Sequence, residues 1–378
     1  MNDTRLYQIC NTCVMDTSDM DIEFDEQGQC NHCRAALIKK SQNTTYIAGK
    51  SEDLLNSIVE KIKIKGKSRT YDCLVGISGG VDSCYVAYKC KKLGLNPLLL
   101  HFDNGWDAEI AVQNIKNVAK NLDLDYLSYV VDWQEFKEIQ LAFLKSSSVD
   151  LEFPTDIGIF ASLNEIAKKH DIKYIISGGN SSSEGILPLT WGYHVTRDLK
   201  YYKAIVKKFS KVPLKKVPVE SILGEVYNKF VKNIKTIYLL NYLNYDKEQA
   251  KEILQTELGW QGYGGKHHES KITAFWQSYV MPVKYNMDYR RATFSSQICS
   301  GQLSRLEALQ MLEMSLPYDP STVETYKKYI AKKYEISDED FEKYLSQPPR
   351  TYKDFKNNKK LVDFVMNTYR SLFKNGRT

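Results

Sequence analysis

The spacing of apolar and polar residues differs between regions of the chain and predicts different secondary structure in each. From residue 71 onward there are four short runs rich in β-branched and aromatic residues, YDCLVGI, NPLLLHF, DLDYLSYVV and IKYIIS. Segments with helical spacing follow these runs, near 81–93, 107–121, 133–146 and 156–170. This alternation predicts an α/β fold, a parallel sheet with helices on both faces, whose ligands bind beyond the carboxyl ends of the strands.

After about residue 190 no further strand-like apolar runs are found, and helical spacing dominates. Helices are expected near 200–211, 219–234, 246–258, 268–280, 302–315, 321–333, 337–346 and 354–374. The chain is therefore expected to contain, in order, a small cysteine-bearing module (1–38), a linker and helix (39–70), the α/β domain (71–195) and a mostly helical region (196–378). The helical region is expected to cover or complete a site made by the sheet.

The composition is that of a globular protein, since 378 residues with 43% hydrophobic and 26% charged side chains can bury the cores of two or three domains. No stretch reaches the roughly 18 apolar residues of a membrane span, and the N-terminal MNDTRLYQIC lacks the apolar core of a signal peptide. We therefore expect a cytoplasmic protein with no membrane partner. The net charge of +6 is mild, although residues 199–219 hold seven lysines and no acid. These lysines form either a solvated face or a docking surface for an anion.

One motif joins a predicted strand to a predicted helix, Ser78-Gly79-Gly80-Val81-Asp82-Ser83. Backbone N–H groups and the helix dipole can hold an anion at such a junction, and glycines let a phosphate approach the backbone. Both serines add hydroxyl donors, while Asp82 can cap the helix or help to hold Mg²⁺. A Walker A loop has lysine before its final Ser or Thr, where this chain has Asp82, so the motif argues against γ-phosphoryl chemistry. SGGVDS resembles the signature of the PP-loop ATP pyrophosphatases, which cleave ATP between the α and β phosphates.

Two further strand ends should meet this loop, HFDNGW (101–106) and SGGNSSSEG (177–185). We predict ATP contacts for both, from Phe102, Asp103, Gly178, Gly179 and Asn180. In the first stretch, Asn104 and Trp106 are candidates for binding the second substrate. Either stretch is alternatively an ordinary turn, because Asn-Gly and Gly-Gly are common turn pairs.

Two cysteine pairs lie near the N-terminus, Cys10-x-x-Cys13 and Cys30-x-x-Cys33, with sixteen residues between the pairs. This spacing predicts a zinc ribbon with four thiolate ligands. With no open coordination position, the Zn²⁺ should be structural and take no part in chemistry. The other four cysteines are scattered and are expected to be ordinary buried thiols.

A cluster of candidate catalytic and binding residues lies further along, in YGGKHHES and YRRATFSSQICSGQLSR. Lys266, His267 and Glu269 are candidates for catalysis, because histidine or glutamate can act as a general base toward an attacking amine. The pair Arg290 and Arg291 suits bidentate binding of a carboxylate or phosphate. Surface or capping roles are the alternative for the histidines.

Taken together, the ribbon, SGGVDS, HFDNGW, PTDIGIFASLNEIAKKHDIKYIISGGN, YGGKHHES and ICSGQLSR resemble a known enzyme family. The family is that of the N-acetyl sugar amidotransferases of bacterial surface-polysaccharide and flagellin-sugar biosynthesis, and the resemblance covers nearly the whole chain. It implies that an acetamido group of a sugar becomes an acetamidino group. Magnesium ATP would adenylate the acetamido oxygen, with release of pyrophosphate, and ammonia would then displace AMP. It also implies substrate contacts from Trp191 and Tyr193, in the Trp-Gly-Tyr at 191–193.

The ammonia is expected to come from a partner. A glutaminase with an N-terminal nucleophile would need cysteine at position 2, where this chain has Asn2, and no cysteine lies in a Gly-flanked elbow. The resemblance implies a glutaminase subunit that works with a cyclase-like barrel subunit. It also implies an anionic acetamido sugar, of the uronic or nonulosonic acid type, as the substrate.

The main alternative is a tRNA thiolation enzyme, which would share the ribbon and the PP-loop. Many such enzymes carry a further cysteine pair beside the loop, whereas Cys84 and Cys90 are six apart and Cys299 is alone. A net charge of +6 on 378 residues also falls short of a strongly basic RNA-binding surface. Nucleic acid is therefore not expected as a partner. A protein that merely senses ATP is a second alternative, disfavoured by the intact SGGVDS.

Overall fold

A five-stranded parallel sheet forms the centre of the protein. The computed structural model describes residues 5–41, 46, 48–193, 197–211, 213, 215–263 and 269–373. Within this part the strand order is β3-β2-β1-β4-β5, and every neighbouring pair is parallel. The strands are β1 (Cys73–Gly76), β2 (Pro97–Asp103), β3 (Tyr126–Val130), β4 (Tyr174–Ser177) and β5 (Lys235–Tyr238). The predicted α/β fold with a parallel sheet is confirmed.

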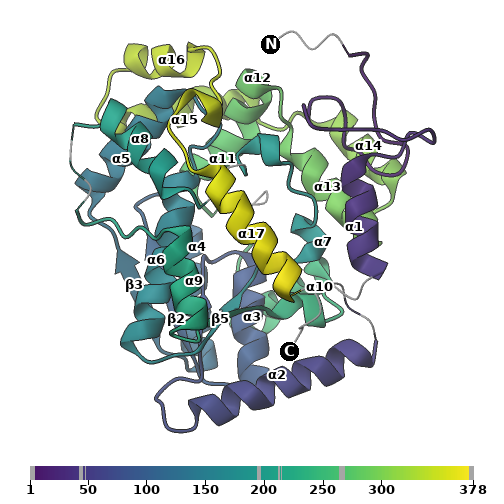
Figure 1. The fold of residues 1–378 in the computed structure, drawn as a ribbon, viewed down its shortest axis with the longest axis vertical. Coiled ribbons are helices and arrows are strands. Elements are labelled where there is room, and N and C mark those ends of the chain that lie inside the picture. Colours follow the sequence, from purple (N-terminus) through teal and green to yellow (C-terminus); the bar gives the residue numbers. More distant parts are fainter. Residues whose placement is uncertain are drawn as a thin grey trace.

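Helices cover both faces of the sheet, as the alternation of side chains along the strands requires. In β2, Leu99 joins a core shared with α2 (Lys50–Gly66), α3 (Val81–Lys92), α4 (Glu109–Leu122) and α10 (Lys247–Leu258). Its neighbours Leu98 and Leu100 belong to a second core, which includes Ile166 of α6 (Phe153–Lys169). Figure 1 shows α2 lying across the end of the molecule below the sheet.

A third and larger core unites the N-terminal module with the C-terminal helices. It contains the four ribbon cysteines together with residues of α5 (Trp133–Ser146), α8 (Leu199–Phe209) and α13 (Tyr289–Ser300). The remaining helices are α1 (Asn31–Ser41), α7 (Ser181–Glu184), α9 (Ile222–Phe230), α11 (Lys271–Phe275), α12 (Met281–Tyr285), α14 (Arg305–Met314), α15 (Pro320–Tyr334), α16 (Asp338–Ser346) and α17 (Lys359–Phe373). Short helical turns are η1 (Leu189–Trp191), η2 (Leu239–Tyr242), η3 (Trp276–Val280) and η4 (Tyr352–Asp354). The N-terminal loops lie beside α13 and α14 in Figure 1.

Among the elements that differ from the sequence prediction are one strand and one helix of the region after residue 190. No strand was expected after about residue 190, but β5 lies at the edge of the sheet and pairs with β4. Its sequence KTIY is mostly exposed, so it lacks the apolar run that marked the other strands. Helix α13 was also missed, because it buries the polar residues Ser295 and Ser296 and so lacks a clean apolar stripe.

Part of the lysine-rich segment 199–219 contacts other parts of the chain. The backbone N–H groups of Lys215, Lys216 and Val217 all donate to the buried carboxylate of Glu135, at 2.9–3.0 Å. The Lys216 ammonium also lies 2.5 Å from Asp132. This end of the segment therefore fastens the chain to α5. Among the described residues, no helix is both long and apolar enough to span a membrane.

Candidate functional site

The SGGVDS segment forms a tight loop between β1 and α3. The Ser83 hydroxyl donates to the Gly80 carbonyl (3.0 Å) and accepts from the Ser78 N–H (3.1 Å). The Ser78 hydroxyl in turn accepts from the Gly80 N–H (3.3 Å). The two hydroxyls and the N–H groups at the start of α3 are thus gathered at the carboxyl end of the sheet, where an anionic phosphate is stabilised.

Gly79 is required by both its conformation and its surroundings. Its φ is +83°, and a Cβ at this position would lie 2.3 Å from the carbonyl oxygen of Ala111 in α4. Its own carbonyl accepts the indole N–H of Trp260 at 2.9 Å. The loop is therefore held from two elements that are distant in the sequence.

We expect Gly79→Ala to weaken ATP binding by at least about tenfold and to lower the free energy of unfolding by about 1–3 kcal/mol. The methyl group must move either the loop or the Ala111 backbone, and the backbone conformation is strained as well. Titration with ATP and urea denaturation would measure the two effects. Gly262→Ala is the matched control, because Gly262 lines the same cavity but a Cβ there meets nothing within 4 Å. Equal ATP affinity and equal stability of the two variants would contradict the conclusion that Gly79 is required in the loop.

The second predicted strand end lies against the first. A Cβ on Gly178 would lie 3.0 Å from the Ser83 backbone nitrogen. Asn180 is buried and caps α7 by accepting the Ser183 N–H (3.0 Å). Its side-chain amide also donates to the Gly178 carbonyl (3.4 Å). The two loops approach closely because Gly178 has no side chain where it meets the backbone of Asp82 and Ser83.

A cavity of about 440 Å³ opens between these loops and the segment from 247 to 269. This volume lies within the roughly 300–1,000 Å³ range of small-molecule sites. The sheet loops contribute Ser78, Gly80, Val81, Asp82, Ser83, Gly178, Gly179 and Glu184. The later segment contributes Lys247, Lys251, Gln255, Trp260, Gly262, Tyr263 and Glu269. The PP-loop therefore lines one wall of a ligand-sized cavity.

Asp82 faces this cavity and is oriented by Tyr245, a residue outside every motif of the sequence analysis. The Tyr245 hydroxyl donates to its carboxylate, and the backbone carbonyl of Tyr245 accepts the side-chain amide of Gln302 (2.6 Å). Burial, and then the charge of Asp82, raise the pKa of Tyr245 far above its ordinary value, so the phenol remains a donor. The described residues hold no group of three or more potential metal ligands except the ribbon cysteines. A Mg²⁺ ion here would therefore be shared between Asp82, phosphate oxygens and water.

Glu269 reaches the cavity because its backbone pairs with the end of the HFDNGW stretch. Its carbonyl accepts the Ala108 N–H (2.8 Å), and the next residue, Ser270, forms a bridge with Asp107. One carboxylate oxygen lies 3.2 Å from the position of a Cβ on Gly80, beside the Tyr263 hydroxyl at 3.0 Å from the same point. Burial and then Glu269 raise the pKa of Tyr263, so a protonated phenol and a carboxylate meet above the loop.

The buried His101 was not selected from the sequence, although it lies beneath the loop. One ring nitrogen is 3.1 Å from the carbonyl oxygen of Ile77, the residue before the motif, and the other is 3.0 Å from a carboxylate oxygen of Asp107. Burial lowers the pKa of His101, but the effects of Asp107, the Ile77 carbonyl and Asp103 together more than offset it, so the net shift of the pKa is upward. His101 thus links the PP-loop to the backbone that positions Glu269.

Several predicted site residues have side chains that lie outside the lining of this cavity. The Phe102 side chain packs between Tyr129 and Phe136, and Asp103 accepts the Gly105 N–H in a turn (2.9 Å). Asn104 is buried and bonded to Thr155, and Trp106 is fully buried with its N–H on Gln140 (2.5 Å). None of these four lines the cavity, because each side chain is used to build the end of β2.

The predicted sugar contacts from the C-terminal half are also displaced from the cavity. Trp191 is buried, and the Tyr193 hydroxyl is bonded to that of Tyr289 (2.8 Å). Arg290 is bonded to Asp288 of its own turn, while Arg291 binds Asp16 (3.0 Å) of the N-terminal module. Binding of a substrate anion by the two arginines is therefore not supported. Lys266 and His267 lie outside the described residues.

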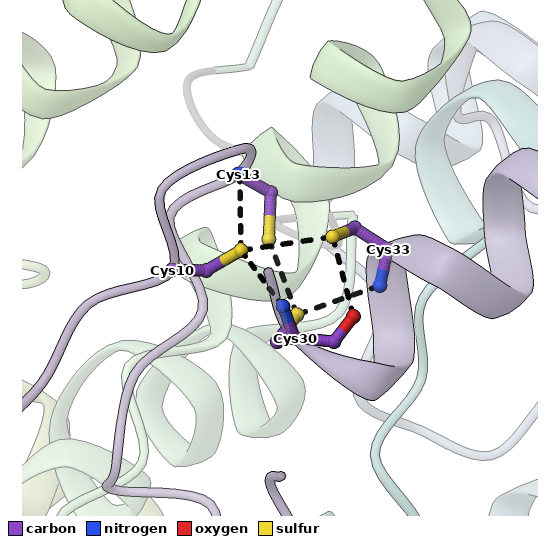
Figure 2. Close-up of side chains that lie close together, drawn as sticks. All are labelled: Cys10, Cys13, Cys30 and Cys33. Carbon is purple, nitrogen blue, oxygen red and sulfur yellow. Dashed lines mark hydrogen bonds between the residues drawn. The ribbon is translucent and has the colours of Figure 1, made fainter. Parts of the chain in front are cut away.

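The four ribbon cysteines converge on one point, as Figure 2 shows. All are buried, and their Sγ atoms lie within 4.8 Å of one another. The pairs Cys10–Cys33 and Cys13–Cys30 are each 3.6 Å apart, close to the roughly 3.8 Å expected between thiolates around tetrahedral zinc. Backbone N–H groups of Cys13 and Cys30 point at the Cys10 sulfur, at 3.4 and 3.2 Å. The cluster has the ligands and geometry of a closed metal site.

The ribbon is bound tightly to the C-terminal region. The Arg305 guanidinium, at the start of α14, donates to the carbonyls of Cys10 (2.9 Å) and Cys13 (3.1 Å). Arg291 donates to the carbonyl of Val14 (2.9 Å), whose N–H donates to Ser295 (3.1 Å). The metal module thus supports the helices α13 and α14, and it does so through the first cysteine pair.

Comparison with known proteins adds one family match. Residues 269–370 match the family described as "LPS biosynthesis protein WbpG-like, C-terminal domain". An uncharacterized protein of Methanocaldococcus jannaschii, MJ1599, is 24% identical over 270 residues, which cover 65% of this chain and 92% of that protein.

Two solved structures are also similar. They are the NH3-dependent NAD synthetase from Campylobacter jejuni (15% identity, 79% and 97% of the two chains covered, TM-score 0.33) and the U34-tRNA thiolase NcsA from Methanococcus maripaludis (13%, 82% and 90%, TM-score 0.34). At these low TM-scores the likeness adds nothing to the fold, which rests on the strand order and the loop. The chain thus combines a parallel sheet that carries the SGGVDS loop with a region, residues 269–370, that is similar to the WbpG-like LPS biosynthesis proteins, in agreement with the surface-polysaccharide family that its motifs resemble.

Proposed function

We propose that this protein is an ATP-dependent amidotransferase that converts an acetamido group of a bacterial surface sugar into an acetamidino group. The strongest support is that the start of the WbpG-like region lies in contact with the PP-loop. Glu269, the first residue of the WbpG-like region, lies against Gly80 in the cavity lined by the PP-loop. A domain typical of LPS biosynthesis therefore supplies a reactive group to a nucleotide site.

In this proposal the PP-loop holds the phosphates of ATP. The N–H groups of the loop and the hydroxyls of Ser78 and Ser83 bind oxygens of the α- and β-phosphates. Asp82 would hold a Mg²⁺ ion, which would supply neutralisation of the phosphate charge. Attack of the acetamido oxygen on the α-phosphorus breaks the bond to the β-phosphate and gives an adenylated imidate.

Ammonia then adds to the imidate carbon, and AMP leaves with the oxygen. Activation is needed because an amide oxygen is a poor leaving group. Glu269 is suited to accept the proton that the attacking nitrogen loses, and the Tyr263 phenol beside it can donate to a charged oxygen. Both groups line the cavity and lie next to Gly80 of the loop.

In this proposal the ammonia comes from outside the chain. A glutaminase nucleophile is an accessible thiol, whereas all eight cysteines are buried and four of them form the metal cluster. We therefore include a glutaminase subunit and a cyclase-like barrel subunit as partners in the proposal. The sugar is proposed to be an acetamido uronic or nonulosonic acid; Arg290 and Arg291 are paired with Asp288 and Asp16 in the structure.

Mass spectrometry tests the reaction. Candidate acetamido sugars are incubated with the protein, magnesium ATP and a high concentration of ammonium salt, while AMP and pyrophosphate are followed in the same tube. The expected product is lighter by the difference between O and NH and forms together with AMP. Glu269→Gln should slow amidine formation more than it weakens ATP binding. AMP formation with tRNA but with no acetamido sugar would instead support a tRNA-modifying enzyme.

A further inference from the structure

We infer that Lys247 and Lys251 of α10 bind the β- and γ-phosphates of ATP and receive the pyrophosphate leaving group. This inference rests on the proposed ATP chemistry and extends it to residues that no sequence motif contains. The motif SGGVDS has Asp82 where a Walker A loop has its phosphate-binding lysine. A cation for the leaving group must therefore come from another part of the chain.

The charges around the cavity point to these two lysines. Its described lining includes three carboxylates, from Asp82, Glu184 and Glu269. Lys247 and Lys251 are the only cationic side chains in that described lining. Without them, the described part of the lining would present only negative charge to a triphosphate, which is costly at the short distances of a half-enclosed site.

The fold of α10 directs both lysines to the cavity. Ala250, Leu254 and Leu258 are almost completely buried and recur every four residues, so they fix the rotation of the helix against the core. Lys247, Lys251 and Gln255 recur with the same spacing and form a second stripe that lines the cavity. The Asp246 carboxylate accepts the Gln249 N–H (2.8 Å) and fixes the start of the helix.

The position of Lys247 is itself unusual for a helix. It is the first residue of α10, where the helix dipole disfavours a cation and favours an anion. A phosphate bound there would interact with the lysine and with the positive end of the helix dipole. Lys251 is 35% exposed in its side chain and pairs with the exposed Glu248 (2.7 Å), a surface contact that a phosphate can replace.

The two lysines would act on the bond that breaks. When the acetamido oxygen attacks the α-phosphorus, the electron pair of the bond to the bridging oxygen stays on the β-phosphate. Pyrophosphate leaves with that added negative charge, and two ammonium groups beside it stabilise the charge as it develops. The Ser78 and Ser83 hydroxyls remain with the α-phosphate on the sheet side.

Calorimetric titration of the full chain tests this assignment with three probes: inorganic pyrophosphate, the α,β-methylene analogue of ATP, and AMP. We expect Lys247→Ala and Lys251→Ala each to weaken pyrophosphate and analogue binding by roughly tenfold or more. AMP binding should change little, because AMP has neither phosphate. Lys251→Arg should restore much of the loss. Lys61→Ala, an exposed lysine in the middle of α2, is the matched control and should change nothing.

Two results would overturn the inference. One is unchanged pyrophosphate affinity in the Lys247→Ala/Lys251→Ala double variant, and the other is an equal loss for AMP. Neither depends on a sugar or on ammonia. If the unmodified protein binds pyrophosphate through these lysines but forms no amidine, the proposed function fails and the lysine assignment stands.

Discussion

Asp82→Asn is expected to lower the rate of AMP and pyrophosphate formation by roughly 10²–10³-fold, the effect of losing about 3–4 kcal/mol of transition-state stabilisation. The substitution keeps the size of the side chain and its bond from Tyr245, but removes the charge that would hold Mg²⁺. The fold should be preserved, because the carboxylate faces a cavity that already contains Glu184 and Glu269. Steady-state release of pyrophosphate at several Mg²⁺ concentrations measures the effect.

Tyr245→Phe separates the charge of Asp82 from its orientation. This variant keeps the carboxylate and removes only the phenol that donates to it. We expect a loss of about tenfold or less, corresponding to roughly one hydrogen bond. Turnover of Asp82→Asn equal to that of the unmodified protein at low Mg²⁺ would show that Asp82 does not serve the metal.

The sheet could be predicted from the sequence wherever burial determines the residue types. Strands β1, β2 and β4 are almost entirely buried, so their apolar runs are visible without knowledge of the partners. The edge strand β5 has exposed residues at three of its four positions and carries no such signal. Helix α13 buries Ser295 and Ser296, whose hydroxyls bond Val14 and Ile186, and those partners cannot be read from local spacing.

The site was predictable in its local motifs and not in its long-range contacts. The loop residues are neighbours in the chain, and their chemistry is visible in the letters SGGVDS. Tyr245 contacts Asp82 across 163 residues, and Trp260 contacts Gly79 across 181. The pair Arg290 and Arg291 looked like an anion site because their carboxylate partners, Asp288 and Asp16, could not be assigned from the sequence.

The segment ICSGQLSR (298–305) connects the C-terminal region to the proposed nucleotide site through two side chains. Gln302 holds the backbone of Tyr245, whose hydroxyl orients Asp82. Three residues later, Arg305 holds the first metal-binding turn of the ribbon. One short segment therefore connects the metal module, the helices α13 and α14 and the loop that binds phosphate. This arrangement predicts that damage to the ribbon will affect the C-terminal wall of the site.

Cys13→Ser is accordingly expected to lower the free energy of unfolding by about 3–5 kcal/mol, together with the loss of stoichiometric zinc. The remaining three thiolates cannot complete a closed tetrahedral site, and the turn that Arg305 and Arg291 bind would lose its shape. Metal analysis and urea denaturation measure the two losses in the same preparation.

Cys299→Ala is the matched control, since it removes a buried thiol from α13 and leaves the cluster intact. It should retain zinc and lose far less stability. In Cys13→Ser at low temperature, ATP binding should survive better than amidine formation, because the PP-loop is built on the sheet while Glu269 begins the region that the ribbon supports. A stable, zinc-free and inactive Cys13→Ser protein would contradict a structural role and place the metal in the chemistry.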